Sequence, residues 1–203
     1  MKKSLKILLM MLLTTIVLTA CANDGQLNQV GIAPYQLTDQ NKDLLQVLGI
    51  ADNVAVFNFK APDEAIDLEL NVYHLSADGT WQNDLAGRIS IGEEREPVDQ
   101  LAGTLAVLLK ENRSFDININ CGGGMVYRVD PLDSAQEYMA SAKMFLSDAQ
   151  AIEINQEIPI ALLLYDNNTE IRSYSLSDYF APSIFEGVDS VQVITVNFRN
   201  SAA

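Results

Sequence analysis

The sequence predicts an all-β protein, an antiparallel β-sandwich of jelly-roll or immunoglobulin-like type with one or two short helices. Three observations lead to this prediction. Many segments alternate apolar and polar residues with the period of two that half-buried strands have. Turn-forming residues separate these segments. Strands and helices do not alternate regularly along the 203 residues, which argues against a parallel α/β sheet.

A short helix is expected at residues 38–49. Thr38 is a favourable N-cap residue, because its hydroxyl can accept a hydrogen bond from a free backbone N–H of the first turn. Apolar residues cluster from Leu44 to Leu48, and Gly49 is typical of the position just beyond a helix end. Signals for both ends therefore bound this helix.

The clearest strand pattern lies at residues 66–74. One predicted face carries Ile66, Leu68, Leu70, Val72 and His74, and the other carries Asp67, Glu69, Asn71 and Tyr73. This alternation predicts one face in the core and the other in solvent. Asp78-Gly79 has the composition of a tight hairpin turn, so we expect the next strand to start near Trp81.

Similar patterns predict further strands at 54–59, 87–92, 103–110, 114–120, 124–129, 158–165 and 191–198. Asp166-Asn167-Asn168 predicts a second hairpin turn, because asparagine tolerates left-handed backbone conformations.

Two structures remain open for residues 133–149. Ser134 and Glu137 fit a helix capping box, whereas Ala142, Met144 and Leu146 alternate as they would in a strand. We favour a strand at 139–146, and either alternative leaves an all-β fold.

The N-terminus has the pattern of a secretory signal. Residues 2–6 are basic, and residues 7–18 form an apolar run that is shorter than the roughly 20 residues a membrane-spanning helix needs. The tetrad Leu18-Thr19-Ala20-Cys21 follows directly and resembles the lipobox of bacterial lipoproteins. This resemblance implies that residues 1–20 are a signal peptide and that Cys21 becomes the lipidated N-terminus at the cell membrane.

We expect residues 21–36 to be the lipidated cysteine and a flexible tether, because this stretch is polar and has no sustained periodicity. Hydrophobic patterning continues from there, so residues 37–203 are predicted to be one β-sandwich domain. The lipid anchor would hold this domain on the extracytoplasmic face of the membrane.

The charge of the chain excludes some partners. Lys and Arg number 13 against 27 Asp and Glu, a formal charge of −14. Three of the lysines precede residue 7, so the remainder carries ten basic against 27 acidic residues and a charge of −17. A surface this acidic repels nucleic acids and anionic lipid headgroups.

Two pairs of residues offer an alternative function, that of a hydrolase. Cys121 precedes three glycines and could act as a nucleophile with His74 as its base. However, the alternation of residues 115–121 points the sulfur into the core, where a thiol is inert. Asp67 and Glu69 have the spacing of paired carboxylates in glycoside hydrolysis, but acidic residues on an outward face are ordinary. We therefore expect no catalytic residues.

Metal and cofactor sites are not expected either. His74 is the one histidine, and there is no cysteine cluster that could complete a zinc site. The acidic turns around Asp78 and Asp166 could attract calcium but lack the spacing of an EF-hand loop.

Trp81 and Tyr73 flank the Asp78-Gly79 turn, and exposed rings on a sandwich can stack on sugars. They are the candidate ligand-binding residues, although a tryptophan at this position often anchors its hairpin.

Segments such as DLLQVLGI, YHLSADGTWQ, NCGGG, INQEIPIALLLYD and YSLSDYF loosely resemble uncharacterised lipoproteins of Gram-positive bacteria. This resemblance contains no motif of known chemistry. The lipid anchor, the acidic surface and the lack of a credible catalytic set predict a membrane-anchored, non-catalytic binding module for a glycan or a protein ligand. A structural or assembly lipoprotein of the envelope is a further alternative to the hydrolase.

Overall fold

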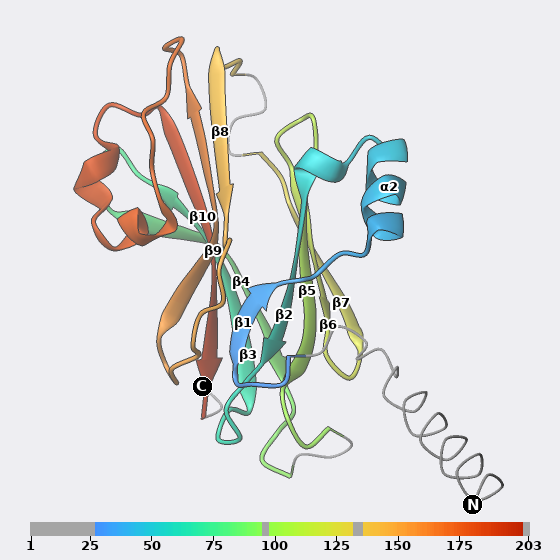
Figure 1. Cartoon of the computed structure of the whole chain (residues 1–203). Coiled ribbons are helices and arrows are strands. Elements are labelled where there is room, and N and C mark those ends of the chain that lie inside the picture. Colours follow the sequence, from blue (N-terminus) through green and yellow to red (C-terminus); the bar gives the residue numbers. More distant parts are fainter. Residues whose placement is uncertain (1–26, 95–97, 132–135, 201–203) are drawn as a thin grey trace, which may run out of the picture.

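The computed structural model describes residues 27–94, 98–131 and 136–200. Within these ranges the chain forms two five-stranded antiparallel sheets that pack against each other (Figure 1). The predicted all-β sandwich is therefore confirmed.

The first sheet, sheet A, has the strand order β1-β2-β5-β6-β7. These strands are β1 (Gly31–Pro34), β2 (Val54–Lys60), β5 (Ala102–Leu109), β6 (Phe115–Asn120) and β7 (Gly124–Val129). The second, sheet B, has the order β4-β3-β10-β9-β8. Its strands are β4 (Trp81–Ser90), β3 (Asp67–Leu75), β10 (Ser190–Arg199), β9 (Glu157–Asp166) and β8 (Ala140–Phe145). The strand favoured for residues 139–146 is thus present as β8.

Part of the predicted tether belongs to the folded domain. Residues 31–34, which we expected to be flexible, form β1 and pair with β2. Ile32 has no exposed surface, and its backbone also bonds in both directions with Gln150. The sequence did not predict this strand, because four residues are too few to establish an alternating pattern.

The core lies between the two sheets. Alternate residues of β3 point inward, where they meet the inward residues of β2, β5 and β6. The fully or almost fully buried members include Leu68, Leu70, Val72, Phe57, Phe59, Leu105, Val107, Phe115 and Ile117. The period of two predicted the inward positions of Leu68, Leu70 and Val72 correctly, whereas His74, predicted on the same face, is partly exposed.

The outer face of sheet B is covered, contrary to prediction. The chain does not turn back after Asp166 but continues through residues 167–189, which include the 3₁₀ helices η3 (Leu176–Phe180) and η4 (Pro182–Phe185). This connection forms a second hydrophobic cluster on sheet B (Figure 1, orange). The predicted hairpin at residues 166–168 is therefore wrong, although β9 and β10 do pair antiparallel.

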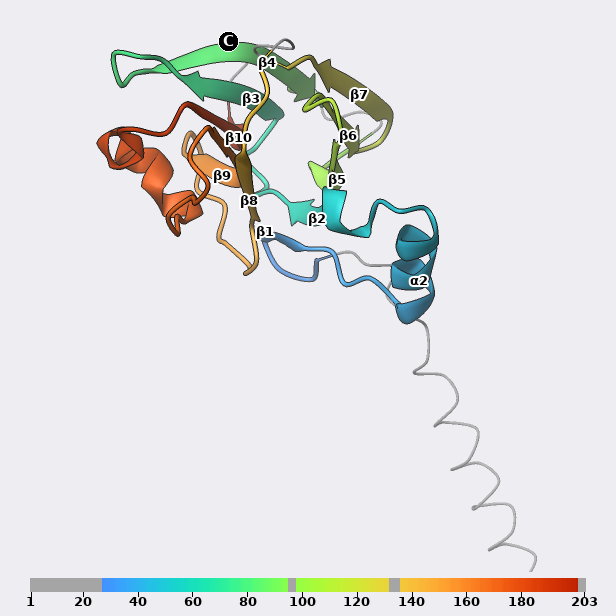
Figure 2. The same cartoon turned by 90° about the horizontal axis from the view of Figure 1, so that it is seen from above.

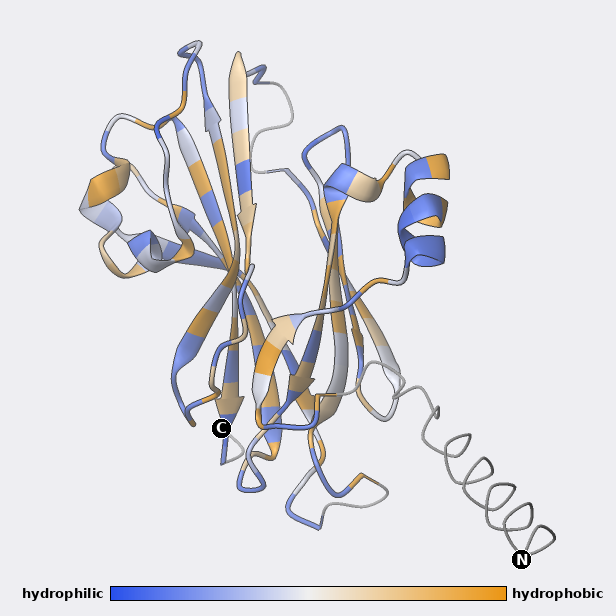
Figure 3. Ribbon diagram, viewed as in Figure 1, coloured by the Kyte–Doolittle hydropathy of each residue, from blue (hydrophilic) through white to orange (hydrophobic). Residues whose placement is uncertain are grey.

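The one α-helix of the described residues is α2 (Asp39–Val47), which precedes the 3₁₀ turn η2 (Ala51–Asn53). Thr38 caps it as predicted, since its hydroxyl accepts a hydrogen bond from the Asn41 N–H at 3.2 Å. No residue of α2 is buried, and Leu44 and Val47 in its second half, which Figure 3 colours as largely apolar, are exposed. No described helix has both the length and the apolar character that crossing a membrane requires.

A tyrosine, Tyr127 of β7, links one pair of sheet edges. Figure 2 shows β4 and β7 side by side where sheets A and B meet. The Tyr127 hydroxyl accepts a hydrogen bond from the Arg88 N–H at 3.0 Å and lies 3.3 Å from the Arg88 carbonyl oxygen. Its ring packs over Gly87, where a Cβ atom would come within 2.5 Å of the ring. Tyr127 therefore covers the main chain of an otherwise open edge strand.

Candidate functional site

A cleft opens at the end of the sandwich, where the β5–β6 turn approaches the start of β8 and the end of β9. It consists of two cavities of about 510 and 200 Å³, which share Glu111, Arg113, Ser141 and Tyr165 in their linings. We call them together the Arg113 cleft. The start of β8, which borders it, lies at the upper end of the molecule in Figure 1.

The β5–β6 turn holds Arg113 in an unusual backbone conformation. The turn closes through hydrogen bonds from the Arg113 N–H to the Lys110 carbonyl (3.0 Å) and from the Lys110 N–H to the Ser114 carbonyl (2.9 Å). Arg113 has φ = 65°, in the left-handed region that glycine or asparagine usually occupies. Such local strain is often found at binding sites.

The Arg113 side chain lies against two tyrosine rings. Its guanidinium carbon is 4.9 Å from the centre of the Tyr138 ring and 5.8 Å from that of Tyr165. The two rings are 5.6 Å apart, and Arg113 Nη2 donates to the Gln136 carbonyl at 2.6 Å. These cation–π contacts fix the guanidinium in the wall of the cleft. Burial raises the pKa of Tyr165, so its hydroxyl remains a neutral hydrogen-bonding group.

The other lining residues are polar and carry both charges. Glu111, Asn112, Gln136 and Glu137 line the larger cavity, whereas Asn53, Lys110 and Lys143 line the smaller one. Lys143 Nζ donates to Asn53 Oδ1 at 2.6 Å and so crosses from sheet B to the segment before β2. Three of the ten Lys and Arg residues that follow Cys21 thus lie at one cleft of a very acidic chain.

The candidate Trp81 is partly buried and packs against the second hydrophobic cluster. Its ring contacts those of Tyr179 and Phe185, with centroid distances of 5.3 and 6.0 Å. Trp81 Nε1 donates to the Tyr179 carbonyl at 3.0 Å. The tryptophan therefore anchors η3 and η4 to sheet B, and this geometry does not favour a sugar-stacking role.

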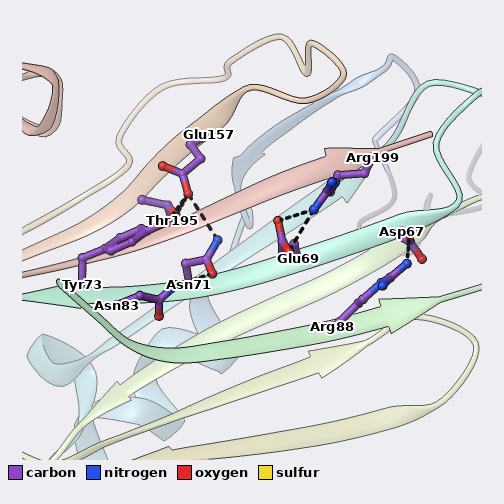
Figure 4. A network of polar contacts seen from close by, with 9 residues as sticks. All are labelled: Asp67, Glu69, Asn71, Tyr73, Asn83, Arg88, Glu157, Thr195 and Arg199. Atoms are coloured by element: carbon purple, nitrogen blue, oxygen red, sulfur yellow. Dashed lines mark hydrogen bonds and ion pairs between the residues drawn. The ribbon is translucent and has the colours of Figure 1, made fainter. Parts of the chain in front are cut away.

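The candidate Tyr73 belongs to a polar network beside this cluster (Figure 4). Its hydroxyl donates to Glu157 Oε1 at 2.6 Å, and Asn71 Nδ2 donates to the same oxygen at 3.2 Å. The Tyr179 hydroxyl donates to the other oxygen, Glu157 Oε2. Burial and the adjacent Glu157 raise the pKa of both tyrosines well above the usual value. Four side-chain donors, with Thr195 at 3.3 Å as the fourth, satisfy Glu157. The network therefore has the features of a structural element.

Asp67 and Glu69 lie in the same region, each beside an arginine (Figure 4). Asp67 has no exposed side-chain surface and forms an ion pair with Arg88. Glu69 binds Arg199 at 3.2 Å. The prediction of a solvated face is wrong for Asp67 and also for Asn71, which is 4% exposed. A buried Asp67 cannot contact a substrate, so the structure does not assemble a carboxylate pair for glycoside hydrolysis.

Cys121 and His74 are far apart. Cys121 lies in the core, as the alternation predicted, with 6% of its surface exposed and a pKa raised by burial. It lines a cavity with residues 89–91 at the end of β4, whereas His74 pairs with Gln82 at the start of β4. Seven residues of strand separate these positions by roughly 20 Å. His74 instead lies 2.7 Å from Asp84, so no catalytic pair forms.

In each of the two acidic turns, a carboxylate accepts hydrogen bonds from residues of the same turn. Asp78 accepts hydrogen bonds from the hydroxyl groups of Ser76 and Thr80, which lower the pKa of Asp78 to about 2. Asp166 accepts from the Asn168 N–H at 2.7 Å. Across residues 27–94, 98–131 and 136–200, no group of three or more His, Cys, Asp or Glu residues is arranged to hold a metal ion.

Sequence reasoning missed the Arg113 cleft. Its residues come from a turn, a connection and two strands that no local pattern links. The one available signal was the position of Arg113 in a short turn between two alternating segments. Cys21 and the tetrad before it lie outside the described residues. The chain matches no protein-family model, no curated protein and no solved structure.

Proposed function

We propose that this protein is a lipid-anchored binding module on the extracytoplasmic face of a bacterial membrane, which holds a glycan or a protein segment in the Arg113 cleft without catalysis. The observation that supports it is the 510 Å³ cavity lined by tyrosine, arginine, amide and carboxylate side chains. Ligand sites usually have volumes of about 300–1,000 Å³ and a few fixed polar groups.

The chemistry of the lining favours binding over reaction. Tyr138 offers a ring and a hydroxyl, and the Arg113 guanidinium offers planar donors that are already held in place. None of the lining residues is a cysteine or a histidine. Rings, amides and charged groups that are held in place around a cavity are suited to non-covalent recognition of a ligand.

The anchor is supported by the order of the N-terminal signals: a basic segment, a short apolar run and a lipobox-like tetrad ending at Cys21. Expression of the full chain in a bacterial host, followed by mass spectrometry, tests it. We expect the first residue to be a diacylglycerol-modified Cys21. An intact, unprocessed N-terminus without an acyl adduct would contradict the anchor.

Ligand binding is tested with soluble protein of residues 22–203 on an array of bacterial cell-wall glycans and on immobilised envelope proteins. We expect binding that Tyr138→Ala abolishes. Trp81→Phe is the matched control, because it retains an aromatic ring at the sequence-predicted position. Binding that Trp81→Phe removes and Tyr138→Ala leaves intact would move the site away from the cleft, provided that both variants keep the parental melting temperature.

If the protein binds neither the glycan array nor the immobilised envelope proteins, the binding-module proposal fails, and the alternative of an assembly lipoprotein gains support. If only the envelope proteins bind, the ligand is a protein rather than a glycan.

A further inference from the structure

Strand β8 has an open edge. It pairs with β9 on one side, and the Leu146 N–H bonds to the Ile160 carbonyl at 2.9 Å just beyond its end. In an antiparallel ladder the peptide groups of alternate residues point to opposite sides. Ser141, Lys143 and Phe145 therefore direct their N–H and C=O groups away from β9. Within the described part of the chain, these groups have no backbone partner on that side.

Neighbouring edges are covered. Tyr127 bonds to the main chain of Arg88 on β4, and Gln150 bonds to Ile32 on β1. β8 has no equivalent cover among the residues described. Open edge strands are the places where sheets accept an added strand.

The Arg113 cleft runs along this open edge. Met139, Ala140 and Ser141 line the larger cavity, and Ser141, Ala142 and Lys143 line the smaller one. A strand placed beside β8 would thus have room for the side chains on its inward face. Those side chains would lie between Lys143 and Arg113.

We infer that the ligand of the cleft is an extended peptide segment of a partner protein, which adds to β8 as a further strand and points acidic side chains inward. This inference rests on the proposed function and names its ligand class. Lys143 and Arg113 outnumber Glu111, the one carboxylate in the lining of the smaller cavity, in a chain that is acidic as a whole. Charge complementarity therefore favours acidic side chains at this position. The free peptide groups of β8 supply the main-chain hydrogen bonds.

The length of β8 also sets the length of the partner segment that can pair with it. The strand has six residues, of which three present peptide groups outward. A partner segment of about six residues would match it, with inward side chains at every second position.

The test uses a library of eight-residue peptides with Asp or Glu at alternate positions, measured by fluorescence polarisation against soluble protein of residues 22–203. Lys143→Pro removes one outward N–H and keeps the β8–β9 bonds, since proline is tolerated on the solvent side of an edge strand. Lys143→Ala is the matched control, because it removes the same charge and keeps the N–H. We expect Lys143→Pro to weaken binding about tenfold or more and Lys143→Ala about threefold.

A second measurement covers the case in which Lys143→Pro does not fold. Hydrogen exchange of the unmodified protein should slow at the Ser141, Lys143 and Phe145 amides when the peptide is bound. Unchanged exchange at these amides, or equal affinities of Lys143→Pro and Lys143→Ala, would refute strand addition.

The experiments distinguish a failure of the strand-addition proposal from a failure of the binding-module proposal. If no peptide binds while a cell-wall glycan binds and is lost on Tyr138→Ala, strand addition is wrong and the binding module remains. If neither peptides, glycans nor envelope proteins bind, both are wrong.

Discussion

The contact between Tyr127 and Gly87 leads to a specific prediction about stability. A Cβ atom at residue 87 would lie 2.5 Å from Tyr127 Cζ and 2.6 Å from Cε1, well inside van der Waals distance. The ring cannot swing away without losing the hydrogen bond between its hydroxyl and the Arg88 N–H. Gly87→Ala should therefore destabilise the fold, because overpacking of this kind typically costs about 1–3 kcal/mol.

The expected net loss is about 1.3 kcal/mol. Alanine makes the unfolded chain less flexible than glycine does, which offsets roughly 0.4–1 kcal/mol of the overpacking cost. For a chain of this size each kcal/mol lowers the melting temperature by about 2–4 °C, so a decrease of about 4 °C is expected. Urea unfolding followed by circular dichroism measures the free energy directly.

A double-mutant cycle provides the control. Tyr127→Ala removes the ring, so adding Gly87→Ala to it should cost almost nothing, and the coupling energy should equal most of the single-mutant loss. Tyr127→Phe keeps the ring but loses the bond to the Arg88 main chain, at a cost of about 1 kcal/mol. Additive effects of Gly87→Ala and Tyr127→Ala, or wild-type stability of Gly87→Ala, would refute the proposed contact.

Three further predictions concern single side chains. The pKa of Asp78 is lowered to about 2 by Ser76 and Thr80, so its contribution to stability is present above the unfolded value near 3.8 and is lost as the pH falls toward 2; Ser76→Ala should raise this pKa in an NMR titration. Glu157→Gln should destabilise the fold by about 1–3 kcal/mol in urea unfolding, because an amide nitrogen cannot accept from the surrounding donors, and unchanged stability would argue against the network. The Cys121 thiol, buried and with a raised pKa, should react with a thiol reagent far more slowly in the native protein than in urea; equal rates would contradict its burial.

Local patterns predicted most of the strands. The alternation at residues 66–74 placed β3, and Asp78-Gly79 placed its turn to β4, because strand period and turn chemistry are both properties of a few adjacent residues. Trp81, by contrast, anchors η3 and η4 rather than its own hairpin, through contacts with residues about 100 positions away that no local pattern indicates.

Long-range contacts could not be predicted in this way. The burial of Asp67 and Asn71 depends on tertiary contacts that no pattern around residues 66–74 indicates. Arg113 meets Tyr138 and Tyr165 only because the β7–β8 connection and the end of β9 approach the β5–β6 turn. The anchor at Cys21 remains a prediction.

Sheet B is covered on both faces, by sheet A and by the connection at residues 167–189, and this limits which of its positions tolerate mutation. β9 and β10 each have a long uninterrupted run of buried residues, whereas β8 has no fully buried residue. Nearly every position of the two central strands is therefore constrained by neighbours on one side of the sheet or the other. A saturation-mutagenesis profile should show continuous intolerance along β9 and β10 but a permissive β8, so that the strand bordering the cleft can diversify while the centre of the sheet stays fixed.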